Sequence, residues 1–325
     1  MSGFSLQPGE LETVGRDLKR PECVLCTRAG DVVASHWDGG VTHIRADGSQ
    51  RHILGMREER SPVGTNGCAI TADGDFLLAD LSEGGGGVWR LTAEGALAPF
   101  VLEVDGVGLP PTNFVGVDRT GRTWITVSTR HEPRHDALRR DVADGYIVLA
   151  DERGARIAAD GLCYTNEAIV DPAGEWLYVN ETMARRTSRY RIALDGTLGE
   201  RETVTEYGLG TFPDGLAFDA EGHVWITAVL ANSVVRVAPD GSQQVIVEEN
   251  DPELLREIET LHESCSLTGR DLARIKTEVM KNISSIAFGG PDLKTVYLGN
   301  LLDDKLYSFR SPVAGAKPSH WEVNL

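Results

Sequence analysis

The stretch TFPDGLAFDAEGHVWIT, residues 211–227, joins a Pro-Asp-Gly turn to an alternating apolar run, which is followed by a turn with Gly222 and a second apolar run. Two short alternating runs around a Gly-containing turn are typical of a β-hairpin. Asp214 stands where the first strand of this hairpin should begin. The same pattern recurs along the chain, and the recurrence indicates what this carboxylate is for.

Other segments repeat this order of polar residue, strand, turn and strand, with eight positions between the polar residue and the turn glycine: PECVLCTRAGDVVAS (21–35), TNGCAITADGDFLLAD (65–80), TNFVGVDRTGRTWIT (112–126) and TNEAIVDPAGEWLYV (165–179). NISSIAFGGPDLKTVYLG (282–299) is a looser sixth copy, with Asp292 in place of the glycine. Six units of this size, each with room for four short strands, are typical of a six-bladed β-propeller. The sequence therefore predicts an all-β fold in which residues 1–325 form one propeller domain.

The polar residues of the six copies are called slot residues below; they are Glu22, Asn66, Asn113, Asn166, Asp214 and Ser284. If each opens the innermost strand of its blade, all six point toward the central axis at one end of the ring. Carboxylate and amide oxygens that converge on one point suit a hard divalent cation. Any one of them would also suit an ordinary turn, since Asn and Asp hydrogen-bond their own backbone. Their common register favours a central metal site.

These stretches resemble the SMP-30/gluconolactonase/luciferin-regenerating-enzyme family of six-bladed propellers. The resemblance covers nearly the whole chain and rests on PECV, PTNFVGVDRTGRTWIT, YTNEAIVDPAGEWLYVNET and FPDGLAFDAEGHVWIT. It implies that Glu22, Asn166 and Asp214 bind one divalent metal, usually Ca²⁺ in that family, and that Asn113 helps to hold water or substrate. Fe²⁺, Mn²⁺, Mg²⁺ and Zn²⁺ remain open, because metal availability can override ligand preference.

The reaction that this resemblance favours is hydrolysis of a lactone by metal-activated water. Asp214 is then the candidate general base, and Asn113 and Asn66 are candidate donors to the developing oxyanion. Phe114 follows Asn113 where the family's sugar lactonases commonly carry Asp, so we expect Phe114 to shape a substrate pocket. His131, in the charged loop at residues 127–141, is a further candidate for substrate binding, although such a loop is more often solvated.

Two other classes of function remain open. The same metal could serve another reaction, such as phosphotriester hydrolysis, or isomerisation or hydration of a non-sugar substrate. Alternatively, the propeller could be a non-catalytic binding module with a structural metal, because a fold alone does not determine a function.

The sequence also supports expectations about the structure of three further segments. Residues 251–282 carry Leu and Ile at helical spacing and are expected to form a helical insertion, which could cap the site or decorate a blade. Either LETVG (11–15) or HWEVNL (320–325) is expected to pair across the seam between the first and last blades and so remove an exposed sheet edge. YVNETMARRTSRYRI (178–192) also resembles the strictosidine-synthase-like branch of the propeller superfamily, and Glu181 and Arg185 are expected to buttress a blade there, since ion pairs between neighbouring strands are the usual role of such charges.

The composition limits the partners and the location. A formal net charge of −17 makes binding to nucleic acid or to an anionic membrane surface improbable and favours a small-molecule substrate. Five scattered cysteines, Cys23-x-x-Cys26 included, indicate core thiols rather than disulfides. The chain shows no signal-peptide pattern, and we expect a cytoplasmic protein. The oligomeric state is not predicted.

Overall fold

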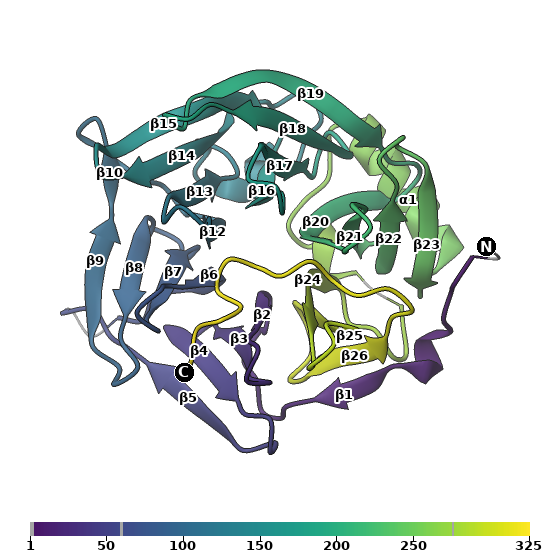
Figure 1. Ribbon diagram of the computed structural model, residues 1–325. Helices are drawn as coiled ribbons and strands as arrows, with labels where there is room; N and C mark the ends of the chain where they lie inside the picture. Colours follow the sequence, from purple (N-terminus) through teal and green to yellow (C-terminus); the bar gives the residue numbers. More distant parts are fainter. Residues whose placement is uncertain (1–2, 59–60, 275) are drawn as a thin grey trace.

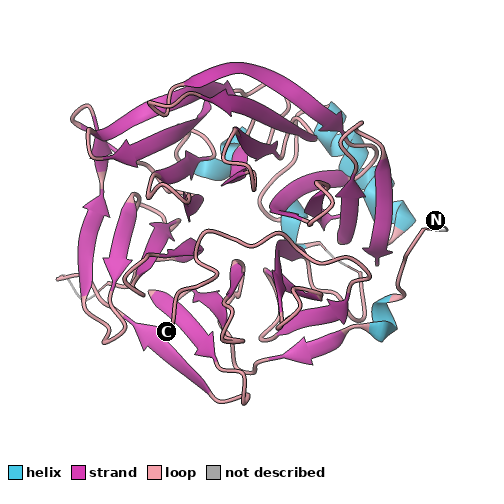
Figure 2. Cartoon of the chain, in the orientation of Figure 1, coloured by secondary structure: helices cyan, strands magenta, loops and turns pink. Residues whose placement is uncertain are grey.

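Six four-stranded antiparallel sheets stand around a central axis in the computed structural model, which describes residues 3–58, 61–274 and 276–325 (Figure 1). The predicted six-bladed β-propeller is therefore confirmed. Each sheet runs outward from the axis, with its first strand innermost. Strands make up most of the ring, and the helical segments lie at its periphery and on one face (Figure 2).

The first three blades follow the chain in order. Blade 1 contains β2 (Val24–Cys26), β3 (Val32–His36), β4 (Gly40–Ile44) and β5 (Gln50–Leu54). Blade 2 contains β6 (Thr65–Ile70), β7 (Phe76–Asp80), β8 (Val88–Leu91) and β9 (Leu97–Val101). Blade 3 contains β12 (Phe114–Val117), β13 (Thr123–Val127), β14 (Gly145–Asp151) and β15 (Gly154–Leu162). A small ribbon of β10 (Glu103–Val104) and β11 (Val107–Gly108) joins blades 2 and 3.

The remaining blades complete the ring. Blade 4 contains β16 (Thr165–Val170), β17 (Trp176–Glu181), β18 (Arg186–Ile192) and β19 (Leu198–Glu206). Blade 5 contains β20 (Thr211–Phe218), β21 (Val224–Leu230), β22 (Ser233–Val237) and β23 (Gln243–Glu248). Blade 6 contains β24 (Ile283–Gly289), β25 (Thr295–Asn300) and β26 (Leu306–Arg310), and its outermost strand is β1 (Glu12–Val14) from the start of the chain.

The seam is closed by β1, which pairs antiparallel with β26 through Glu12↔Ser308 and Val14↔Leu306. Of the two predicted candidates, LETVG therefore closes the ring. HWEVNL forms no strand, because the chain beyond Ser311 leaves blade 6 and crosses the axis instead (Figure 1). Trp321 ends this crossing in the hydrophobic cluster that blades 1 and 6 share. This pairing gives blade 6 four strands, like the other five blades, and covers the outer edge of β26.

The innermost hairpins show why the repeat has its glycines. Gly30, Gly74, Gly121, Gly174 and Gly222 all have positive φ, between 75° and 90°. Residues with a Cβ rarely adopt this conformation, so the spacing of these glycines fixes the five turns. Two turns carry a further tie, because Asp118 accepts a hydrogen bond from Trp124 Nε1 at 3.0 Å and Asp219 accepts one from Trp225 Nε1 at 2.9 Å.

Hydrophobic side chains between adjacent blades form the core. Trp124 of β13 packs with Ala168, Leu177 and Val179 of blade 4, and Trp225 packs with Phe288 of blade 6 at a ring distance of 5.3 Å. Both indoles are about 1% exposed or less. The blades are thus held to one another by side-chain packing as well as by ring closure.

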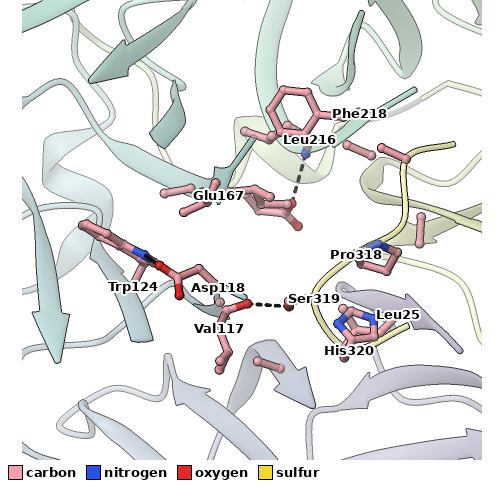
Figure 3. A pocket seen from close by; sticks show the side chains of 18 of the residues that line it. Leu25, Val117, Asp118, Trp124, Glu167, Leu216, Phe218, Pro318, Ser319 and His320 are labelled. Atoms are coloured by element: carbon pink, nitrogen blue, oxygen red, sulfur yellow. Dashed lines mark hydrogen bonds between the residues drawn. The ribbon is translucent and has the colours of Figure 1, made fainter. Parts of the chain in front are cut away.

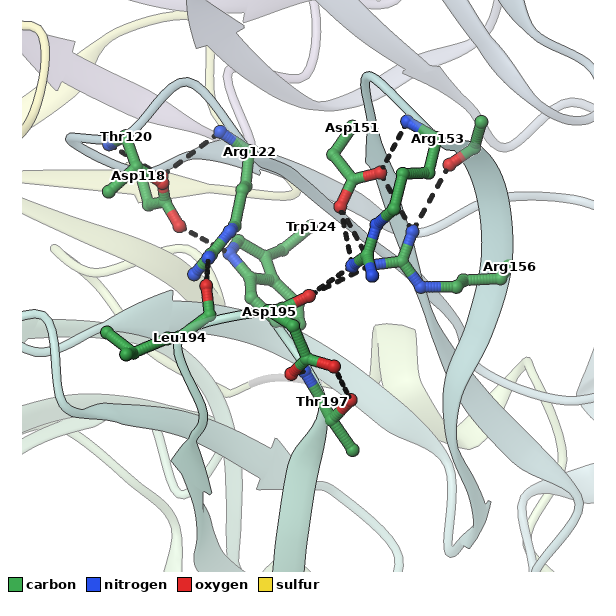
Figure 4. A network of polar contacts seen from close by, with 11 residues as sticks. Asp118, Thr120, Arg122, Trp124, Asp151, Arg153, Arg156, Leu194, Asp195 and Thr197 are labelled. Carbon is green, nitrogen blue, oxygen red and sulfur yellow. Dashed lines mark hydrogen bonds and ion pairs between the residues drawn. The ribbon is translucent and has the colours of Figure 1, made fainter.

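Blades 3 and 4 are also joined at the surface by a polar network (Figure 4). Arg122 in the β12–β13 turn donates to the Leu194 carbonyl, and Arg153 in the β14–β15 turn donates to the Asp195 carbonyl. Arg156 holds Asp151 through two hydrogen bonds of 2.8 and 2.7 Å. These exposed contacts fix the relative position of three hairpin turns, and each contributes little free energy because water competes for the same groups.

In the predicted insertion at 251–282, the described residues form one α-helix, α1 (Pro252–Glu263), and a short 3₁₀ turn at Asp271–Ala273. Asp251 caps α1 by accepting hydrogen bonds from the N–H groups of Glu253 and Leu254, each at 2.9 Å. The other described residues of the insertion are irregular, since its Ser residues and Thr268-Gly269 favour turns. Within the described part of the chain, no helix is long and apolar enough to cross a membrane.

Glu181 has the predicted structural role in a blade, but its partner is not Arg185. Glu181, at the end of β17, instead accepts from Arg186 of β18 at 2.7 and 2.8 Å. Arg185 has a positive φ in the β17–β18 turn and points away, to Glu259 of α1 at 2.6 Å. The turn conformation therefore separates two adjacent arginines, one tying blade 4 together and the other tying α1 to it.

Candidate metal and substrate site

The inner strands carry irregularities at the slot residues. Register shifts occur between Thr65 and Cys68 in β6, between Thr165 and Ala168 in β16, and between Pro213 and Leu216 in β20. Each interval contains one slot residue. A β-bulge re-aims a side chain out of the regular alternation, and bulges are common beside functional sites. Glu22 and Asn113 reach the same place from the segments that precede β2 and β12.

Five slot residues meet in a cavity of about 50 Å³ at one end of the channel, which we call the slot cavity. Its lining comprises Arg20, Glu22, Asn66, Asn113, Arg134, Leu138, Tyr164, Asn166, Thr182, Met183, Asp214, Val229, Leu272, Asn282 and Leu301. The five slot residues are each at most 6% exposed. Ser284 is not in this lining, because its hydroxyl donates instead to the Glu22 carbonyl at 2.9 Å.

Hydrogen bonds orient the slot residues toward a common centre. Asn66 Nδ2 donates to Glu22 Oε1 at 2.9 Å and to the Asn113 carbonyl at 3.0 Å. Asn113 Nδ2 donates to Ser128 at 3.0 Å, and Asn166 Nδ2 donates to Thr182 at 3.1 Å. Glu22 Oε2 and Asn166 Oδ1 remain buried without a partner among the described residues. A buried oxygen without a hydrogen-bond donor lowers the stability of the fold. A cation bound by Glu22 Oε2 and Asn166 Oδ1 would satisfy both oxygens.

The electrostatics of the two carboxylates agree with a cation site. Burial raises the pKa of Glu22 to about 7, against the opposing positive charges of Arg20 and Arg134. Burial, together with the neighbouring Glu22 carboxylate, raises the pKa of Asp214 well above its usual range. When two neighbouring carboxylates are shielded from water, both can be ionised at once only if a positive charge lies between them.

Arg20 and Arg134 are functional candidates that the sequence patterns missed. Arg20 lies just before blade 1, donates to Asn66 Oδ1 at 2.6 Å and stacks on Trp37 at 4.6 Å. Arg134 comes from the loop at 127–141 and donates through Nε to the Tyr164 hydroxyl at 3.1 Å. Neither arginine belongs to the repeated hairpin, so the other copies of the repeat have no equivalent position that could have pointed to it. The concentration of charge in the 127–141 loop was the one available signal for Arg134.

A comparison with protein-family models matches residues 37–249 to the SMP-30/gluconolactonase/LRE-like region. The chain belongs to this family. A 6-deoxy-6-sulfogluconolactonase from Pseudomonas putida is 29% identical over 238 residues, which cover 71% of this chain and 67% of the relative.

Solved structures share the fold of this SMP-30/gluconolactonase-like protein. A gluconolactonase from Xanthomonas campestris aligns with a TM-score of 0.67 and 19% identity over 93% of this chain and 89% of its own. Regucalcin from Agrobacterium tumefaciens, a calcium-binding protein, aligns with a TM-score of 0.68 and 17% identity over 99% and 100%.

Two predicted substrate-binding residues of this family member lie outside the slot cavity. Phe114 is 4% exposed and packs with Cys23 and Cys68 below the slot residues. It points there because successive residues of a strand face opposite ways, and Asn113 takes the direction of the slot cavity. His131 lies at the surface, 46% exposed, with Nδ1 2.9 Å from Asp144. The loop at 127–141 therefore approaches the cavity through Arg134 rather than through His131.

The mouth of the slot cavity is built by two inserted segments. Ala137 and Leu138 of the 127–141 loop pack in one hydrophobic cluster with Leu254, Ile258 and Leu267 of the insertion. The two segments are in contact again at Gly269, where an added Cβ would lie 3.5 Å from that of His135. Leu138 and Leu272 both line the cavity. The insertion thus stands on the face of the ring that carries the site, and not only on a blade edge.

A second and larger cavity, of about 180 Å³, lies at the other end of the channel (Figure 3). We call it the tail cavity, because residues 316–320 pass across it. Its walls are mainly apolar and include Phe114, Leu216 and Phe218. Ala316 donates to the Phe218 carbonyl at 2.9 Å and Ser319 donates to the Val117 carbonyl at 2.5 Å, so the tail is pinned to blades 5 and 3.

One buried acid stands in the tail cavity. Glu167 follows slot residue Asn166 and accepts a hydrogen bond from Leu216 N at 3.0 Å through Oε2, whereas Oε1 has no partner among the described residues. Burial raises the pKa of Glu167 well above its usual range. Cys23, Cys26 and Cys68 line the same cavity as free thiols. Burial also raises the pKa of Cys26, so Cys23-x-x-Cys26 has the character of core packing rather than of a reactive pair.

One further cluster of acidic and histidine side chains, Asp219, Glu221 and His223, lies in the β20–β21 turn. Arg236 occupies its centre, with Nη2 2.7 Å from Asp219, 2.7 Å from Glu221 and 3.0 Å from His223 Nδ1. The guanidinium supplies the positive charge that these groups need. This cluster therefore fastens a turn, and the slot cavity remains the candidate metal centre.

Proposed function

We propose that this protein is a metal-dependent lactonase that opens a cyclic ester in the slot cavity. The observation that carries the proposal is the convergence of Glu22, Asn166 and Asp214, where two buried oxygens have no partner among the residues that the structure describes. Family membership and the lactonase relatives support lactone hydrolysis in general. Glu22, Asn166 and Asp214 would hold the metal, and the regucalcin fold neighbour makes Ca²⁺ the first ion to test.

A divalent cation bound there supplies a Lewis acid for the ester carbonyl and lowers the pKa of water. Asp214 accepts the proton of the attacking water on a carboxylate oxygen while a C–O bond forms at the carbonyl carbon. The ring C–O bond then breaks, and the same proton passes to the departing ring oxygen. The product is an open hydroxy acid, and Asp214 returns to its starting state.

The neighbouring amides have different roles in this proposal. Asn113 donates one amide hydrogen to Ser128 and keeps a second for the oxyanion. Asn66 has both amide hydrogens engaged, by Glu22 Oε1 and by the Asn113 carbonyl. Asn66 is therefore assigned to positioning Glu22 rather than to stabilising charge on the substrate.

The test uses protein stripped by a chelator and reloaded with single divalent metals, Ca²⁺, Mg²⁺, Mn²⁺, Zn²⁺ or, under anaerobic conditions, Fe²⁺. Acid release from sugar and non-sugar lactones is followed in a pH-stat, and bound metal is counted by elemental analysis. We expect one bound metal per chain and turnover only with metal present. Stoichiometric metal binding without hydrolysis of any lactone would reject the lactonase proposal in favour of another metal-dependent reaction or of a binding propeller.

A further inference from the structure

We infer that the substrate carries an anionic group, which Arg20 and Arg134 bind at the mouth of the slot cavity. This inference rests on the proposed function and specifies its substrate class: a lactone with a carboxylate, sulfonate or phosphate substituent. The residues that carry it are two guanidinium groups in one cavity whose charges are not used by an ion pair in the described structure.

The first observation is that neither arginine is bound to a carboxylate. Arg20 donates to the neutral amide oxygen of Asn66, and Arg134 donates to the neutral hydroxyl of Tyr164. Arg134 Nη1 is buried and has no partner among the described residues. A guanidinium presents five donors in a fixed fork that suits carboxylates and phosphates, so an unused buried donor on Arg134 points to an anionic acceptor.

The second observation is the balance of charge. Glu22 and Asp214 are the carboxylates of the slot cavity, and together they offset one divalent cation. With that cation bound, the positive charges of Arg20 and Arg134, which line the same cavity, would have no anionic partner left among the lining residues. Two like charges in a shared, poorly solvated site require a counter-ion. The local field therefore favours an anion although the whole chain carries a net charge of −17.

The third observation is how the two side chains are held. Arg20 stacks on Trp37 and Arg134 lies over Tyr164, at 4.6 and 5.6 Å from the ring centres. Aromatic stacking fixes the plane of a guanidinium and so reduces the entropy lost when it binds a ligand. The other cavity walls near them, such as Leu138 and Leu272, are apolar. An apolar surround excludes water and strengthens a charge-assisted contact.

The experiment compares lactones that differ in one substituent. Glucono-lactones with hydroxyl, carboxylate, sulfonate or phosphate at carbon six share one reacting ester. We expect metal-loaded wild-type protein to show a kcat/KM about tenfold or more higher for the anionic members than for the neutral one. Arg134→Gln should reduce this ratio by about tenfold, and Arg134→Lys should retain part of it. Arg139→Gln removes the same charge from the same loop, where Arg139 pairs with Asp141 at the surface, and should keep the wild-type ratio.

A second measurement does not depend on turnover. Inorganic sulfate is titrated calorimetrically into metal-loaded protein at constant ionic strength; we expect binding to wild type and Arg139→Gln, and loss of binding in Arg134→Gln. Equal kcat/KM for neutral and anionic lactones would overturn the inference while leaving the lactonase proposal intact. If no lactone is hydrolysed, the proposed function fails, and the sulfate titration alone then tests the anion site. Sulfate binding that is as strong in Arg134→Gln as in the wild type would overturn the anion site.

Discussion

The two ends of the channel use neighbouring residues for opposite purposes. At one end Glu22, Asn113 and Asn166 face the slot cavity, and at the other end the residues that directly follow them, Cys23, Phe114 and Glu167, face the tail cavity. A shift of one position along an inner strand therefore changes a charged, cation-competent site into a largely apolar chamber. The comparison teaches that the alternation of a strand, together with a bulge, can separate chemistry from packing within one channel.

The largest effect is expected for Asp214→Ala, which tests whether metal binding and catalysis depend on the slot cavity and not on the tail cavity. We expect Asp214→Ala to lose bound metal and to lower kcat/KM by at least about 1,000-fold, because it removes the residue proposed as both a metal ligand and the general base. Glu167→Gln changes the buried acid of the tail cavity while keeping an acceptor for Leu216 N, and should retain metal and turnover. Full activity of Asp214→Ala in the lactone assay would contradict the proposed mechanism.

Phe114→Ala tests the assignment of that residue to packing. The ring is buried among Cys23, Cys68 and other core side chains. We therefore expect the free energy of unfolding, measured by denaturant titration, to fall by about 3–5 kcal/mol. The relative kcat/KM values for different lactones should stay as in the wild type. A changed order of lactone preference with unchanged stability would instead return Phe114 to the substrate pocket.

A change of pH should act on the cover of the tail cavity through His320. Burial lowers the pKa of His320 to about 4, whereas an unfolded histidine titrates near 6.5. Between these values the unfolded chain binds the proton and the folded chain does not, so this residue lowers stability as the pH falls from about 6.5 to 4. We expect the loss of Tm between pH 7 and pH 5 to be smaller in His320→Gln than in the wild type, and an identical loss would exclude this role.

The smallest effect is expected at the surface of the 127–141 loop. Because His131 contacts Asp144 and does not line the slot cavity, His131→Ala should change kcat/KM by less than about twofold. The same assay on Arg134→Gln provides the contrast within one loop. A large loss in His131→Ala would show that the loop brings the histidine into the site when substrate binds.

The sequence was sufficient to predict the ring and the meeting of five slot residues, because both follow from local rules repeated along the chain. The turn glycines fix five of the six inner hairpins, and the residue eight positions before each of them lines the slot cavity. Arg20 and Arg134 were not predictable in this way. They lie on irregular segments whose course depends on tertiary contacts, such as the packing of Leu138 against the insertion. For the same reason the exposed His131 and the irregular end of the insertion differed from expectation.

The clasp between β1 and β26 has a consequence for folding. Residues 12–14 pair with residues 306–308, and all five of the other blades lie between these two segments along the chain. Contacts of such long sequence separation are slow to form, because the entropy of closing the loop must be lost first. Until then β1 is unpaired and blade 6 presents the open edge of β26, which can pair with other chains. The folding chain is therefore most vulnerable to aggregation at the stage when a nearly complete ring still lacks these last hydrogen bonds.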